Sequence, residues 1–184
     1  MSTQANLFSP FGLETAPEGS RPLLQRVQRS FKFIPNLYAS FANSPVLLEG
    51  YLGLEGVFEK ASLSAVERQI VLLAASVENS CKYCTAAHST VLKAFLHAPA
   101  EVVFAVRSNQ PLSDPKLNAL VTLTKEIVSE RGHVRAQTIE NFLAAGYRKE
   151  QVLEVLIGIA LKTMSNYLDH LSPNELDQPF RSEG

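Results

Sequence analysis

Residues 78–89 read Glu78-Asn79-Ser80-Cys81-Lys82-Tyr83-Cys84-Thr85-Ala86-Ala87-His88-Ser89 and contain both cysteines of the chain. A helix turns by about 100° per residue, so Cys81, Cys84 and His88 would share an arc of about 60° on one helical face. Two thiols and a base on one face can carry out redox chemistry or bind a metal ion. The rest of the chain is then the scaffold that presents this face.

Length and composition describe one ordinary globular domain. The chain has 184 residues, of which 46% are hydrophobic and 19% charged, with a formal net charge of −1. So small a net charge does not indicate a nucleic-acid-binding surface. No apolar run reaches the roughly 20 residues that a membrane-spanning helix needs. Residues 1–6 show no secretory signal, and the two cysteines then favour a reducing compartment, so we expect a cytoplasmic protein.

Apolar residues recur at spacings of three and four along most of the chain, which is the pattern of packed helices. This pattern predicts an all-α domain of about seven or eight helices over residues 21–171, because no stretch alternates at strand period for long enough to pair. Residues 1–20 are expected to form an irregular N-terminal arm and residues 172–184 an irregular C-terminal tail, since both contain prolines that break regular structure.

The helix before the cysteines has a clear start. Ser64 with Glu67 three residues later is a capping-box pattern, and residues 69–77 are apolar almost all round. This apolar surface is more than one small helical layer would cover, so a homo-oligomer is expected. Asn79 or Ser80 is expected to cap the helix that follows.

The two cysteines are expected at the start of that next helix, which covers about residues 81–96. The thiolate is the reactive form of cysteine, and a helix N-terminus favours it at Cys81. His88, one turn beyond Cys84, can instead accept the Cys84 proton, so the residues alone leave the order of attack open. Either thiol could form a sulfenic acid, and the other could then close a disulfide that an external reductant reopens.

Three alternatives stand beside peroxide chemistry. The same thiols could reduce a disulfide of a protein partner, as a disulfide reductase or a redox sensor. Two cysteines and His88 could also bind zinc, with a fourth ligand from elsewhere: Glu78, His97, His133 or His170. The simplest alternative is a pair of buried structural cysteines. The CxxC spacing, with a histidine on the same helical face, favours redox chemistry over the last two.

Residues 63–88, which end in the CxxCxxxH motif, resemble the core of the carboxymuconolactone decarboxylase and alkylhydroperoxidase D superfamily. Three shorter segments are similar to its peroxidase-related branch: Ile34-Pro35-Asn36-Leu37-Tyr38, Asn43-Ser44-Pro45 and Asn166-Tyr167-Leu168-Asp169-His170. The resemblance covers about residues 30–175. It implies an all-helical fold that assembles into trimers or hexamers and reduces hydroperoxides through its thiols.

Carried over residue by residue, the resemblance makes Cys84 the attacking thiol, Cys81 the resolving thiol and His88 part of the proton relay. It implies no bound cofactor or metal, but an external dithiol or thioredoxin-like reductant. One position departs from the family pattern, which often has a glutamate twelve residues before the first cysteine. That position is Gln69, which cannot act as a base. Glu78, three residues before Cys81, is the candidate replacement.

Overall fold

The computed structural model describes residues 7–184, and in this range the chain folds into nine α-helices and no β-strand. The all-α prediction is therefore confirmed. None of the described helices is both long enough and apolar enough to cross a lipid bilayer. The helices are α1 Arg21–Phe31, α2 Asn36–Phe41, α3 Pro45–Phe58, α4 Ala65–Glu78, α5 Lys82–Thr90, α6 Ala100–Arg107, α7 Pro115–Ser129, α8 Ala136–Ala144 and α9 Lys149–Leu171.

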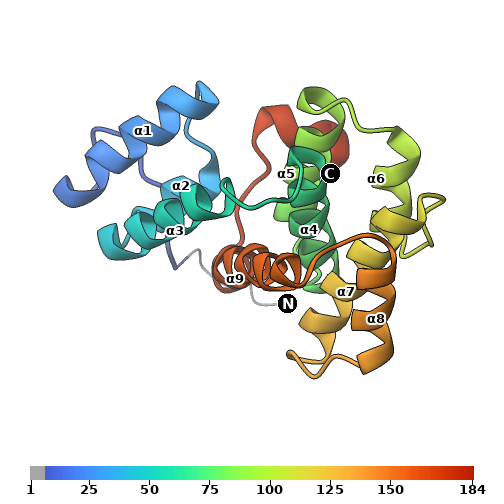
Figure 1. The fold of residues 1–184 in the computed structure, drawn as a ribbon. Coiled ribbons are helices and arrows are strands. Elements are labelled where there is room, and N and C mark those ends of the chain that lie inside the picture. The colour runs from blue at the N-terminus through green and yellow to red at the C-terminus, as the bar shows by residue number, and fades with distance from the viewer. Residues whose placement is uncertain (1–6) are drawn as a thin grey trace.

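Helix α4 forms the centre of the fold. It packs against α5, α6, α7 and α9, and Figure 1 shows α1–α3 as a group on one side of it and α6–α8 on the other. Residues 70–76 are all buried within the single chain. The apolar surface of α4 is thus covered by the chain's own helices, so the expectation that it needs a second subunit is wrong. Any assembly must use another surface.

The capping box at the start of α4 is present as predicted. The Ser64 hydroxyl accepts a hydrogen bond from the Glu67 backbone at 3.2 Å, and the Glu67 carboxylate accepts one from the Ser64 backbone at 2.8 Å. Glu67 also accepts a hydrogen bond from the Tyr147 hydroxyl at 2.9 Å and pairs with Lys116 at 3.2 Å. This carboxylate therefore fixes the start of α4, at the opposite end of the helix from the cysteines.

The link between α4 and α5 interrupts the helical register. Asn79 ends α4 as its C-cap, Ser80 has a φ of +59°, and Cys81 is extended with φ −84° and ψ 105°. A positive φ lies in the left-handed region, where a helix commonly ends. Cys81 is itself the N-cap of α5, so the prediction that Asn79 or Ser80 caps this helix is wrong. After Thr90 the helix widens into a π-helical turn, Val91–Phe95, close to the predicted end.

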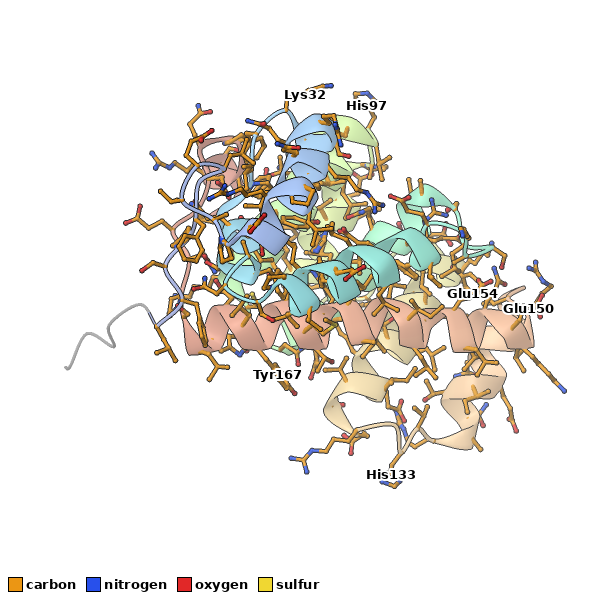
Figure 2. All side chains as sticks on the ribbon, turned by 90° about the vertical axis from the view of Figure 1, so that its left-hand side faces the viewer. Lys32, His97, His133, Glu150, Glu154 and Tyr167 are labelled. Atoms are coloured by element: carbon orange, nitrogen blue, oxygen red, sulfur yellow. The ribbon has the colours of Figure 1, made fainter. Side chains whose placement is uncertain are left out.

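Helix α9 runs straight across the molecule (Figure 2) and carries a buried polar face. Lys162, Ser165, Asn166 and Asp169 are all buried, at 8% exposure or less. Spacings of three, four and seven residues place them on one side of the helix. This side faces the α4–α5 link, because the Asn79 side-chain amide donates to Asn166 Oδ1 at 3.0 Å. A row of polar groups therefore enters the core beside the cysteines.

The chain beyond α9 folds back onto α5, and we call residues 173–184 the C-terminal strap. The tail is not irregular throughout, because Gln178–Glu183 forms a 3-10 helix with Phe180 buried beneath it. Glu183 pairs with two basic side chains, Lys93 at 2.6 Å and Arg107 at 3.0 Å. Of the N-terminal arm, residues 1–6 lie outside the described range, and Glu18–Ser20 forms a single 3-10 turn.

Candidate active site

Both cysteines are free thiols at the start of α5, and each is only 1% exposed. Cys81 Sγ accepts a hydrogen bond from the Cys84 backbone at 3.4 Å, as an N-cap does, and its thiol donates to Asp169 Oδ2 at 3.4 Å. Cys84 Sγ lies 3.9 Å from Ser165 Oγ. The first turn of α5 therefore holds the two sulfur atoms side by side against the polar face of α9.

The two thiols differ in acidity. The adjacent Cys81 thiol and then the Lys162 ammonium lower the pKa of Cys84 to about 6, although burial opposes them. The Cys84 sulfur, burial and the Asp169 carboxylate all raise the pKa of Cys81. At neutral pH Cys84 is therefore the thiolate and Cys81 the protonated thiol. The helix N-terminus does not reverse this order, because Cys81 as the cap lies against a carboxylate.

His88 is held between two side chains from other helices. Its Nε2 lies 2.7 Å from Lys162 Nζ, and its Nδ1 lies 2.9 Å from Gln69 Oε1. A lysine ammonium can only donate, so Nε2 accepts, and Nδ1 carries the proton that it donates to Gln69. Burial and the Lys162 charge lower the pKa of His88, which keeps the ring neutral. Within residues 7–184 no hydrogen bond joins His88 to either cysteine, and its contact on the α9 side is with Lys162, whose charge lowers the pKa of Cys84.

A cavity of about 100 Å³ opens onto Cys84. Cys84 and His88 line it, whereas Cys81 does not, so only one of the two sulfurs faces the space where a substrate would fit. Most of its wall is apolar or aromatic. The lining side chains are Phe31, Pro35, Leu37, Tyr38, Tyr51, Glu55, Gln69, Leu72, Tyr83, Cys84, Ala87, His88, Val91, Leu161, Lys162 and Phe180.

One wall of this cavity comes from the C-terminal strap. Phe180 meets the Tyr83 ring edge to face, with ring centroids 6.0 Å apart. The Tyr83 hydroxyl donates to the Asp177 carboxylate, which also accepts from the Asn36 backbone at 3.2 Å. Tyr83 lies between the two cysteines in sequence, so its contacts with Phe180 and Asp177 join the strap to the start of α5, where both thiols lie.

Two charged residues of the cavity were missed by the sequence reasoning. Lys162 is 1% exposed on α9, and Glu55 on α3 accepts a hydrogen bond from the Tyr38 hydroxyl at 2.5 Å. A signal for Lys162 exists in the sequence. It begins the series Lys162, Ser165, Asn166 and Asp169, which repeats at helical spacing inside an otherwise apolar helix. Glu55 interrupts an apolar helix in the same way, but nothing local indicates where it points.

Glu78 is the predicted site residue that the structure does not bring to this group. It is half-buried at the end of α4, it does not line the cavity, and its charge acts on Lys125 of α7 instead. The prediction placed Glu78 and Cys81 on one helical face. The left-handed Ser80 and the extended Cys81 break that register, so the spacing of three residues does not align the two side chains.

The remaining histidines lie on the surface. His97 and His133 are exposed at opposite edges of the molecule, as Figure 2 shows, and His170 is exposed and stacks on Tyr167. In the described part of the chain, no three side chains of His, Cys, Asp or Glu are grouped so that they could hold a metal ion. A zinc site at the cysteines would also need His88, whose two ring nitrogens are both engaged.

The fold is that of several solved structures. An alkylhydroperoxidase AhpD core, an uncharacterized peroxidase-related protein from Ralstonia eutropha JMP134, superposes with a TM-score of 0.82 at 21% identity, over 96% of this chain and 96% of that one. A peroxidase-related protein from Silicibacter sp. TM1040 gives 0.80 at 14% identity, over 100% and 99%. The debrominase Bmp8 gives 0.82 at 16% identity, over 98% and 97%.

The chain therefore has the AhpD-like helical fold. Residues 47–126, which include the CxxC motif and the following histidine, match the model of the Carboxymuconolactone decarboxylase family. The resemblance inferred from the sequence is confirmed over that stretch. No match was found among curated proteins.

Proposed function

We propose that this protein is a thiol-dependent peroxidase that reduces hydroperoxides through a disulfide cycle of Cys84 and Cys81. One observation carries the proposal: the sulfur that faces the cavity, Cys84, is also the one whose pKa is lowered to about 6. A thiolate that lines a small, mostly apolar cavity is a nucleophile placed against a small substrate. Cys81 lies beside it, where a resolving thiol has to be.

The chemistry follows from these positions. The Cys84 thiolate attacks the terminal oxygen of the hydroperoxide, so an S–O bond forms, the O–O bond breaks, and the alcohol leaves after it gains a proton. Cys84 is then a sulfenic acid. The Cys81 thiol condenses with it, water leaves, and the disulfide closes. Asp169 Oδ2, which accepts the Cys81 S–H hydrogen bond, is placed to take that proton.

The cycle requires an external reductant and no resident cofactor. A dithiol returns two electrons and two protons to the disulfide. Since both sulfurs are only 1% exposed, a small dithiol reaches them more easily than the disulfide of a folded protein partner would. This geometry disfavours the protein-disulfide reductase as the main activity.

The test combines turnover with trapping. The wild-type protein should consume tert-butyl hydroperoxide continuously with a dithiol reductant, and Cys81→Ser, tested without reductant, should consume about one equivalent and stop at the Cys84 sulfenic acid. A cyclic diketone added to that variant should modify Cys84, as located by mass spectrometry. Absence of peroxide consumption by the wild type, or an adduct at another residue, would contradict the proposal.

A debrominase among the structures with this fold provides a second substrate for the same assay. Aromatic rings from Phe31, Tyr38, Tyr51 and Phe180 line the cavity, and such a wall also suits a flat aromatic substrate. Bromide release from 2,3,4-tribromopyrrole, with no peroxide consumption, would favour reductive dehalogenation by the same two thiols.

We also propose that the protein assembles through the outer face of α9. Leu153, Leu156, Tyr167 and Leu171 are 44–64% exposed. At about 100° per residue they fall within an arc of about 60° along one side of the helix. Figure 2 shows Tyr167 at the lower edge of α9. An aligned row of this kind is typical of an interface.

Sedimentation of the purified protein should therefore give a species larger than a monomer at micromolar concentration. The variant Leu156→Glu should shift it toward the monomer, because it places a charge within the apolar row. A wild-type protein that sediments only as a monomer would contradict this proposal.

A further inference from the structure

We propose that Glu55 is the acid that gives its proton to the leaving oxygen of the hydroperoxide, a role that rests on the peroxidase function proposed above. The need for an acid is chemical. An alkoxide is strongly basic, so its departure is slow unless it is protonated as the O–O bond breaks. The sequence pattern offers no acid here, since Gln69 occupies the position of the expected carboxylate and Glu78 lies outside the cavity.

The other polar side chains around the cavity are already committed. The one N–H of His88 goes to Gln69, and the amide of Gln69 is no acid. Lys162 donates to His88, and its charge, after the Cys81 thiol, helps to lower the pKa of Cys84. The Tyr83 hydroxyl donates to the strap, and burial and neighbouring negative charges raise the pKa of Tyr51 and Tyr83 further from neutrality.

Glu55 has the geometry of an acid. Its Oε1 accepts a hydrogen bond from the Tyr38 hydroxyl, which leaves Oε2 as the oxygen that can carry a proton. Glu55 lines the cavity together with Cys84 and Lys162. Among the ion pairs of residues 7–184, none joins Glu55 to Lys162. The carboxyl and the ammonium thus line the same cavity as Cys84 without neutralising each other as an ion pair.

The surroundings of Glu55 favour its protonated form on balance. Burial raises its pKa, and the Glu59 carboxylate at the C-cap of α3 adds to this. The Tyr38 hydrogen bond, the Lys162 ammonium on α9 and the Arg26 guanidinium on α1 oppose the shift, but burial is the largest influence. A carboxyl in such a site keeps its proton to higher pH than one in water.

The proton balance closes over one cycle. The Cys84 thiolate, the hydroperoxide and the Glu55 carboxylic acid give a sulfenic acid, an alcohol and a Glu55 carboxylate. When the external dithiol later reduces the disulfide, Cys84 is regenerated as a thiol. Its ionisation returns one proton to Glu55, and both groups are ready for the next peroxide.

The experiment compares substrates whose leaving groups differ. The variant Glu55→Gln keeps the shape and the hydrogen bond to Tyr38 but cannot supply a proton. With tert-butyl hydroperoxide, whose alkoxide needs an acid, its rate of sulfenic acid formation should fall by about 100-fold. With peracetic acid, whose carboxylate leaves without one, the loss should be within about threefold. Alkylation of Cys84 by iodoacetamide should remain unchanged.

The pH profile gives a second readout. The wild-type rate with tert-butyl hydroperoxide should fall as the pH rises through the pKa of Glu55, because only the protonated acid can act. The fall in rate at high pH should be missing in Glu55→Gln and present in the control Glu59→Gln, which removes an exposed carboxylate at the C-cap of the same helix. Equal losses with both peroxides would show a structural role, and no loss would exclude Glu55. A failure of the peroxidase proposal appears separately, as a wild-type protein that consumes no peroxide.

Discussion

Replacing Cys84 by serine should lower the steady-state rate of hydroperoxide reduction by at least about 10³-fold. A serine hydroxyl stays protonated at neutral pH, so no strong nucleophile faces the cavity. The loss should appear in the rate of sulfenic acid formation as well as in turnover, because Cys84 is the sulfur that lines the cavity. Stopped-flow measurement of peroxide consumption with a dithiol reductant checks both.

The matched control is Cys81→Ser, which keeps the attacking thiolate and loses only the resolving thiol. A fold defect in Cys84→Ser is visible as a lower melting temperature, and the neighbouring Ser165 hydroxyl offers the new serine a partner. The assignment of roles is wrong if Cys84→Ser still consumes one equivalent of peroxide, because the attack would then come from Cys81.

The second large effect is expected at Lys162. In Lys162→Met the side-chain volume is largely kept, but the ammonium that favours the Cys84 thiolate is gone. The pKa of Cys84 should rise from about 6 toward its ordinary value. At pH 6.5 the rate of iodoacetamide alkylation should then fall by about tenfold, and at pH 10 the two proteins should react alike. Alkylation rates measured from pH 5 to pH 10 give both pKa values.

The variant Lys82→Met is the control, since it removes an exposed positive charge beside the same cysteines. This variant should leave the pH dependence of the alkylation rate unchanged, because an exposed charge is screened by water and salt. If the pH dependence of alkylation is unchanged in Lys162→Met, the Cys81 thiol alone stabilises the Cys84 thiolate. Loss of the buried charge need not destabilise the fold, because Met can fill the space in an apolar interior.

The same pKa shift links Cys84 to stability. Its pKa in the folded protein, about 6, lies below the value of about 8.5 in an unfolded chain. Ionised Cys84 therefore stabilises the folded state fully above the unfolded pKa, and this contribution is lost as the pH falls through about 6. The dependence of the free energy of unfolding on pH should be weaker over this window in Lys162→Met.

Local patterns in the sequence predict much of the fold. The helical periodicity predicts an all-α chain, and Ser64 and Glu67 mark the start of the central helix as the structure has it. The CxxCxxxH pattern indicates Cys84 and His88, which share one cavity wall. These features depend on neighbours within one or two helical turns, which is the range over which sequence patterns are informative.

Other parts of the site depend on contacts across the fold. Lys162 reaches His88 across 74 positions of sequence, and Glu55 reaches the cavity from a helix that precedes the motif. Glu78 lies away from the cavity for a local reason, because a serine with positive φ is uncommon and the sequence gives no sign of it. A helical wheel drawn through residues 78–88 therefore mixes two helices.

The position of Phe180 has a consequence for folding. Among the residues that line the cavity it is the last to be made, and it lies in the strap rather than in the helical body. A folding chain can therefore bring together all the other lining residues before this wall is added. Docking of the strap is then the step that completes the cavity.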